Sequence, residues 1–248
     1  MRPEQWLFVT DLEGTLALFT REYMAQFQYP SVWQALAYAL GPECFKREQD
    51  LTARWDHLRK QDQNKARFRY RQFVDATARI HQAHGLTTNL FDGVLDSIPW
   101  IDGIAETFDA ITDSNGVIAI LTGGFANHAE RVPGRGSVRA IKAGCRYFFD
   151  ERGTLASWKS DNCDTHGKVS AIEAMIANYR IDPHRCVFAG DGRNDTHIAK
   201  HVAEQGGLSI ALNARDELKA VATVAIDSPD YRTLLDPTFK HLNKVSIS

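Results

Sequence analysis

The sequence predicts an α/β protein whose core is a doubly wound, Rossmann-like parallel sheet and which carries an inserted helical cap domain. Short, β-rich apolar runs recur along the chain and are separated by helix-length stretches, as is typical of such a sheet. One long interval instead shows helical spacing without comparable runs. We therefore expect residues 1–20 and 98–248 to form the core, and residues 21–97 to form the cap.

The predicted strands are short apolar runs that end beside polar or glycine residues. The first covers residues 6–10 and leads into Asp11 and Gly14, as a buried parallel strand followed by a turn would. The later runs cover residues 117–121, 146–149, 186–189 and 208–211. Residues 131–137 are rich in Gly and Arg, and they predict a surface loop that follows a helix.

The predicted cap shows helical spacing, as in Trp33, Leu36 and Leu40. Residues 46–79 contain ten Lys and Arg against five Asp and Glu, although the whole chain has a net charge of −2. Such a run is usually the solvated face of a helix. The alternative is that some of these cations face an anionic substrate.

Composition and charge limit the partners and the compartment. Lys and Arg number 29 against 31 Asp and Glu, so no nucleic-acid partner is expected. The 44% hydrophobic and 24% charged residues are ordinary for a folded globular protein. Four dispersed cysteines form no C-x-x-C pair, and no secretory or membrane-spanning segment is recognised. We expect a reduced, cytoplasmic protein without a membrane partner, and the oligomeric state stays open.

Three polar clusters, at residues 11–15, 121–124 and 190–195, follow predicted strands. They are expected at one edge of the sheet, because parallel strands present their carboxyl ends to the same crevice. Two clusters are acidic, and carboxylates with room for water and phosphate oxygens suit Mg²⁺. The third offers Thr122 and glycine amides as phosphate donors at an expected helix N-terminus. Lys168 can add the positive charge that a phosphoryl site needs.

These residues resemble the four ordered motifs of the haloacid dehalogenase-like phosphohydrolases, and most closely those of the phosphoserine phosphatase branch. The motifs read Asp11-x-Glu13-Gly14-Thr15, Thr122-Gly123-Gly124-Phe125, Lys168, and Gly190-Asp191-Gly192-x-Asn194-Asp195. Residues 207–214 resemble the final strand segment of that branch. The resemblance covers the core over residues 6–226, whereas the cap matches by position and character.

The resemblance implies nucleophilic catalysis by Asp11, with an aspartyl-phosphate intermediate that water later hydrolyses. Glu13 would be the general acid and base, although most relatives carry Asp at its position. Mg²⁺ would be held by Asp11, the backbone carbonyl of Glu13 and Asp191. Lys168 would link phosphate and Asp11, and Asp195 would steady the metal shell or Lys168.

The resemblance also implies a set of substrate contacts. Thr122 and Gly123 would bind phosphate oxygens, and Asn194 lies in a loop that touches the substrate. Arg71 lies near the place where phosphoserine phosphatases have a carboxylate-binding Arg. Thr20 stands where those enzymes have a Glu for the substrate ammonium, and Glu22 is a candidate replacement.

The implied activity is Mg²⁺-dependent hydrolysis of a small phosphorylated metabolite, with a phosphoserine-like substrate among the candidates. Two alternatives stay open at this point. The aspartyl-phosphate could transfer its phosphoryl group to an alcohol acceptor instead of water. The fold could also serve as a non-catalytic module that binds a phosphorylated ligand.

Overall fold

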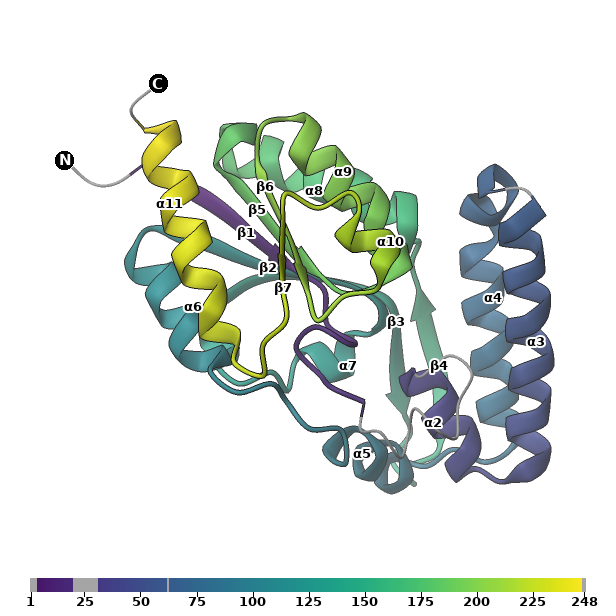
Figure 1. Ribbon diagram of the computed structural model, residues 1–248. Coiled ribbons are helices and arrows are strands. Elements are labelled where there is room, and N and C mark those ends of the chain that lie inside the picture. The colour runs from purple at the N-terminus through teal and green to yellow at the C-terminus, as the bar shows by residue number, and fades with distance from the viewer. Residues whose placement is uncertain (1–3, 20–30, 62, 247–248) are drawn as a thin grey trace.

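A single sheet organises the computed structural model, which describes residues 4–19, 31–61 and 63–246 (Figure 1). Among these residues seven strands form this sheet in the order β4-β3-β2-β1-β5-β6-β7. In that order they are β4 (Leu155–Ser160), β3 (Val138–Phe149), β2 (Gly116–Phe125), β1 (Trp6–Thr10), β5 (Cys186–Gly190), β6 (Leu208–Leu212) and β7 (Val224–Ile226). All neighbours pair in parallel except β3 and β4. The predicted doubly wound α/β fold is therefore confirmed.

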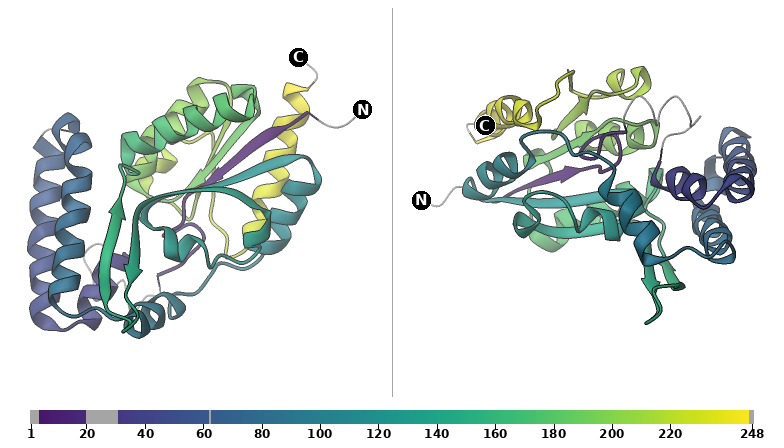
Figure 2. Two further views of the ribbon diagram at one scale, coloured as in Figure 1. Left: turned by 180° about the vertical axis from the view of Figure 1, so that it is seen from behind. Right: turned by 90° about the horizontal axis from the view of Figure 1, so that it is seen from below.

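Helices cover both faces of this sheet, as Figure 2 shows from two further directions. Those of the core are α6 (Ile104–Asp113), α7 (Ala126–Ala129), α8 (Thr165–Tyr179), α9 (Thr196–Glu204), α10 (Asp216–Lys219) and α11 (Leu235–Val245). Helices α6 and α11 contribute to the hydrophobic cluster on one face, and α8, α9 and α10 to the cluster on the other. Each face of the sheet thus has its own core.

Strand β1 shows why its sequence is apolar throughout. Trp6 and Phe8 belong to the cluster beneath α6, whereas Leu7 and Val9 belong to the cluster beneath α8 and α9. Successive side chains of a strand point to opposite faces, so a central strand that is covered on both sides needs apolar residues at every position. This burial fixes the position of Asp11, which directly follows the strand.

Four strands differ from the prediction. Strand β2 continues through residues 122–124 to Phe125 instead of ending at Leu121, and β3 begins at Val138 instead of Arg146. The first part of β3 is mostly half-buried and lacks a continuous apolar run. Strands β4 and β7 were not predicted, because β4 is an exposed edge strand and β7 spans three residues.

The described part of the predicted cap contains four helices beside the β4 edge of the sheet (Figure 1). They are α2 (Val32–Ala39), α3 (Pro42–Gln61), α4 (Gln63–Ala83) and α5 (Thr88–Asp96). Hydrogen bonds tie α4 to the β3–β4 hairpin: His81 Nδ1 lies 2.9 Å from the Tyr147 hydroxyl, Trp158 Nε1 donates to Asp75 at 2.9 Å, and Gln82 Nε2 donates to two carbonyl groups of β4. The limits of the cap at residues 21 and 97 stay a prediction.

Two further features concern the whole described chain. Its four cysteines are buried and free of disulfide bonds. Within the described ranges, no helix combines the length and apolarity that a bilayer crossing requires.

Candidate active site

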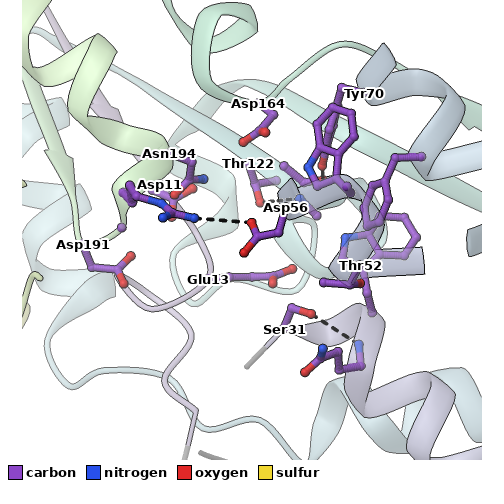
Figure 3. A pocket seen from close by; sticks show the side chains of 18 of the residues that line it. Asp11, Glu13, Ser31, Thr52, Asp56, Tyr70, Thr122, Asp164, Asp191 and Asn194 are labelled. Atoms are coloured by element: carbon purple, nitrogen blue, oxygen red, sulfur yellow. Dashed lines mark hydrogen bonds and ion pairs between the residues drawn. The ribbon is translucent and has the colours of Figure 1, made fainter. Parts of the chain in front are cut away.

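The end of β2 and the loops that follow β1 and β5 line a pocket of about 280 Å³ together with residues of the cap (Figure 3). Asp11 and Glu13 come from the first loop, residues 122–124 from the end of β2, and Asp191 and Asn194 from the loop after β5. The structure thus brings together residues that lie far apart in the sequence, at the sheet edge where they were expected. Their chemical roles stay predictions.

Lys168 connects two of the acidic groups beneath this pocket. It lies in the first turn of α8, is fully buried, and donates from Nζ to Asp11 Oδ1 at 2.6 Å and to Asp195 Oδ1 at 2.7 Å. Burial by itself lowers the pKa of this ammonium, but the two carboxylates outweigh burial and hold the pKa above its ordinary value. Lys168 is therefore a permanent cation beside Asp11.

Asp191 is held on the other side of Asp11 by the loop after β1. Thr15 Oγ1 donates to Asp191 Oδ1 at 3.0 Å. Gly14 lies against the same carboxylate with a φ of +91°, and a Cβ there would overlap Asp191. Glycine is needed at position 14 both for this backbone conformation and for the space.

Asp195 orients the loop that carries Asp191. Its Oδ2 accepts from the backbone N–H groups of Asp191 at 3.2 Å and Gly192 at 3.0 Å, while its Oδ1 accepts from Lys168. Because both oxygens already have donors, we expect Asp195 to steady the loop and Lys168 more than to bind a metal directly.

The donor set at this end of the pocket fits a small divalent cation. Ligand atoms of Asp11, Asp191 and Asp195 lie within 4.8 Å of one another. Burial, followed by repulsion from Asp195, raises the pKa of Asp11 to about 7. Burial and repulsion from Asp11 likewise raise the pKa of Asp191. One ammonium does not offset three carboxylates, of which Asp11 and Asp195 are buried and Asp191 is partly buried. An all-oxygen set with excess negative charge suits Mg²⁺.

Glu13 reaches from the β1 loop to the N-terminus of a cap helix. Its Oε2 accepts from the backbone N–H of Val32, the first residue of α2, at 3.3 Å. Burial raises the pKa of Glu13 to about 7 in spite of this hydrogen bond. A carboxyl group with a pKa near neutrality can both give and take a proton at physiological pH.

The Thr122–Gly124 segment differs from expectation, because it lies in strand β2 and not at the N-terminus of a helix. The following helix, α7, begins at Ala126 and has only four residues. Thr122 Oγ1 accepts from the Gly124 amide at 3.0 Å, and the Tyr70 hydroxyl of α4 donates to the Gly123 carbonyl. Both Thr122 and Gly123 nevertheless line the pocket.

The predicted substrate contacts are only partly found at the pocket. Asn194 lines it, within the short turn after β5. Arg71 is exposed on α4 and is not among the lining residues, so the structure does not bring it to the site. Thr20 and Glu22 lie outside the described residues.

Several lining residues were missed from the sequence. Arg193 and Arg215 follow β5 and β6, and their positions after strand ends could have indicated them. The cap supplies acidic and aromatic side chains that carry no sequence motif. These cap residues are Glu48, Trp55, Asp56, Tyr70 and Phe73, accompanied by Trp33, Gln34 and Thr52.

A doubly wound sheet with nucleophile, acid–base and metal-ligand candidates at the carboxyl ends of its strands is the arrangement of an α/β enzyme. The family model of the haloacid dehalogenase-like hydrolases matches residues 7–202, and the chain belongs to this family. The family resemblance seen in the motifs is thereby confirmed.

Similarity to individual proteins points to one branch of the family. The chain is 27% identical to a phosphoserine phosphatase of Idiomarina loihiensis over 64% of this chain and 70% of that protein. It is 25% identical to the Haemophilus influenzae phosphoserine phosphatase over 63% of this chain, which spans only 48% of that relative. A solved phospho-aspartyl intermediate analogue of phosphoserine phosphatase has the same fold, with a TM-score of 0.68, 18% identity, and coverage of 94% and 99% of the two chains.

Proposed function

We propose that the chain is a Mg²⁺-dependent phosphomonoester hydrolase that acts on a small phosphorylated metabolite through an aspartyl-phosphate on Asp11. The observation that carries this proposal is the buried Asp11 carboxylate, held by Lys168 within a pocket that also contains Asp191 and Glu13. The names of the relatives, phosphoserine phosphatases, support the reaction class. A phosphoserine-like substrate is one candidate within that class.

The first half of the reaction forms the covalent intermediate. A carboxylate oxygen of Asp11 attacks phosphorus, and the bond between phosphorus and the ester oxygen breaks. Protonated Glu13 gives its proton to the departing alkoxide, which leaves as an alcohol. Lys168 fixes Asp11 for the attack and offsets negative charge next to it.

The second half returns the enzyme to its starting state. Glu13, now a carboxylate, takes a proton from water, and the resulting hydroxide attacks phosphorus. The bond between phosphorus and Asp11 breaks, and inorganic phosphate leaves. The pKa of Glu13 near 7 supports both directions of proton transfer.

The remaining residues bind and orient. When bound by Asp11, Asp191 and the Glu13 carbonyl, Mg²⁺ would supply positive charge between the two anionic reactants. Thr122 and Gly123 are the candidates for binding phosphate oxygens, and Asn194 for contact with the rest of the substrate. The pocket volume of about 280 Å³ suits a metabolite of a few heavy atoms beyond the phosphate.

Phosphate release from p-nitrophenyl phosphate tests this proposal. We expect release that requires Mg²⁺, stops on addition of chelator, and is abolished by Asp11→Asn. Mass spectrometry after an acid quench should detect a phosphoryl adduct on Asp11 in the native protein. The control is Asp113→Asn, which makes the same change at an exposed residue of α6. Turnover that persists in Asp11→Asn, or in the presence of chelator, would contradict the proposal.

A further inference from the structure

The cap presents opposite charges to the solvent and to the pocket. Of the basic residues in 46–79, those with described side chains are all exposed and absent from the pocket lining: Lys46, Arg47, Arg54, Lys60, Arg69, Arg71 and Arg79. The charged cap residues that do line it are the acids Glu48 and Asp56. The basic stretch is therefore a solvated helix face in its described part, and the wall that meets the substrate is acidic.

Glu48 is a buried acid without a full set of partners. It is 1% exposed, and its Oε1 accepts from Thr52 Oγ1 at 2.8 Å, whereas its Oε2 has no hydrogen-bond partner among the described residues. The neighbouring Gln34 is 2% exposed, and the described part of the chain offers no donor to its Oε1 either. Both residues line the pocket. Buried acceptors without donors are costly, so a ligand that brings N–H donors would stabilise this wall.

No cation of the described residues forms an ion pair with Glu48. Burial raises the pKa of Glu48 to about 7, although the hydrogen bond from Thr52 acts in the opposite direction. Asp56, the second acid of the wall, lies 3.4 Å from Arg193 of the core. A cation beside Glu48 would thus meet a carboxylate that this structure leaves without an ion pair among the described residues.

Aromatic rings border the same wall. Trp55, Tyr70 and Phe73 all line the pocket, and their ring centroids lie 5.4–6.1 Å apart. The faces of such rings attract ammonium groups, including methylated ones, in addition to packing against carbon. Figure 3 shows Asp56, Thr52 and Tyr70 on the cap side of the pocket, across from the Asp11 loop.

We propose that the alcohol portion of the substrate carries an ammonium group and no carboxylate, and that Glu48 and the aromatic wall bind this ammonium. The inference rests on the proposed function and narrows its substrate to phosphomonoesters of amino alcohols. A carboxylate on the alcohol would face Glu48 and Asp56, and charges of the same sign that are brought close together repel each other. Among the described residues, the cations that line the pocket are Arg193 and Arg215, which come from core loops.

The test compares esters that differ in the charge of the alcohol. Phosphoethanolamine and phosphocholine carry an ammonium, 2-hydroxyethyl phosphate is a neutral counterpart, phosphoglycolate is anionic, and phosphoserine carries both charges. We expect kcat/KM for phosphoethanolamine to exceed that for 2-hydroxyethyl phosphate about ten-fold or more, as a hydrogen bond to a charged group would give. Phosphocholine has no N–H donor, so its gain should come from its charge and from contact with the aromatic rings. Phosphoserine and phosphoglycolate should be poorer substrates than phosphoethanolamine.

A pair of variants on one helix isolates the role of Glu48. Glu48→Gln should bring the ratio of kcat/KM between the ammonium and the neutral ester close to one. This ratio is the informative quantity, because a folding or catalytic defect lowers both values alike. Glu43→Gln is the matched control, since Glu43 lies in the first turn of α3, is 73% exposed and pairs with Arg47. It should keep the native ratio.

The possible outcomes separate this inference from the proposed function. If p-nitrophenyl phosphate is hydrolysed but the neutral or anionic ester is preferred, the inference is wrong and the hydrolase stands. If no ester is hydrolysed, the hydrolase proposal fails, and calorimetric binding of phosphoethanolamine and 2-hydroxyethyl phosphate decides the inference. Tighter binding of phosphoethanolamine that Glu48→Gln removes would support it, and equal binding would overturn it.

Discussion

Glu13, the proposed acid–base residue, needs the space that a glycine leaves at position 124. Glu13 is held by the Val32 amide through Oε2, and its Oε1 lies where a Cβ on Gly124 would be. Glu13 lies shortly after β1, and Gly124 lies near the end of β2. These two strands are neighbours in the sheet, which brings the two positions together. Gly124 thus provides the space in which the Glu13 carboxyl group is oriented toward the pocket.

Gly124→Ala should therefore impair catalysis while leaving the fold intact. The added methyl group displaces the Glu13 carboxyl group, and we expect kcat to fall by about 10²-fold, the lower range for loss of a general acid–base group. The measurement is steady-state turnover of p-nitrophenyl phosphate, with circular dichroism as the check on folding. Gly136→Ala, where a Cβ meets nothing within 4 Å, is the control and should retain native turnover. Native turnover in Gly124→Ala would show that Glu13 is not constrained in this way.

At the scale of elements, helix α4 contacts the core strand β3 through a buried histidine. His81 is fully buried, and its Nδ1 bonds with the Tyr147 hydroxyl at 2.9 Å. Burial lowers the pKa of His81 to about 3. The folded protein therefore keeps this ring neutral at a pH where the unfolded chain, with a pKa near 6.5, binds a proton.

This contact predicts a specific dependence of stability on pH. Because the unfolded state binds more protons below pH 6.5, the contribution of His81 to the free energy of unfolding falls as the pH falls. Between pH 6.5 and pH 4 the loss amounts to about 3 kcal/mol. Relative to that of His81→Gln, the free energy of unfolding of the native protein should fall by that amount, as measured by urea unfolding at each pH.

A control for this dependence is His57→Gln, which removes an exposed imidazole from α3. Its difference in stability from the native protein should stay nearly constant over the same range. A constant difference for His81→Gln as well would mean that the folded protein protonates His81, and would contradict the assignment of a neutral ring.

The sequence predicted those elements whose burial is the same along their whole length. Strands β1, β5 and β6 are covered on both faces and consist of buried residues throughout, so each is a continuous apolar run. Strand β4 and the first part of β3 are mostly half-buried or exposed and have no continuous apolar run, so their sequences do not distinguish them from loops.

The same reasoning applies to the site. Asp11 and Asp191 could be predicted because a residue that directly follows a central strand has its place fixed by that strand. Glu48 and Trp55 could not, because the face of α3 that meets the pocket is set by packing against α4 and not by a motif. Glu48 and Asp56 also lie within a stretch of sequence in which basic residues predominate, so its net charge does not reveal an acidic pocket wall.

At the scale of the whole molecule, the sheet gathers three carboxylates that repel one another. Asp11 follows β1, Asp191 and Asp195 follow β5, and Lys168 arrives from α8. This cluster costs stability in the absence of a cation, because burial and mutual repulsion both disfavour the charged groups. A bound divalent ion should offset that cost.

We expect Mg²⁺ to raise the thermal stability of the native protein. At a concentration of about 100 times its Kd the ion should add about 2.7 kcal/mol to the free energy of unfolding, which differential scanning calorimetry can measure. Asp191→Asn should lose this increase. Without Mg²⁺ at pH 8, the Asp191→Asn variant should have a higher melting temperature than the native protein. The increase should be about 2–4 °C for each kcal/mol of charge repulsion that the substitution removes.

Asp113→Asn again provides the comparison, since it makes the same substitution away from the cluster. It should respond to Mg²⁺ as the native protein does. A native protein whose melting temperature is independent of Mg²⁺, or an Asp191→Asn variant that still responds, would argue against a cation site formed by these carboxylates.

The buried cysteines give the protein four internal reporters of local opening. Burial raises the pKa of Cys44 in α3 to about 11, raises those of Cys163, before α8, and Cys186 in β5 to about 12, and also raises that of Cys145 in β3. Since only the thiolate reacts readily with an alkylating reagent, each cysteine becomes reactive mainly when its surroundings unfold. The order in which the four are labelled would therefore rank the cap, the β3–β4 hairpin, the segment before α8 and the central sheet by how readily each one unfolds.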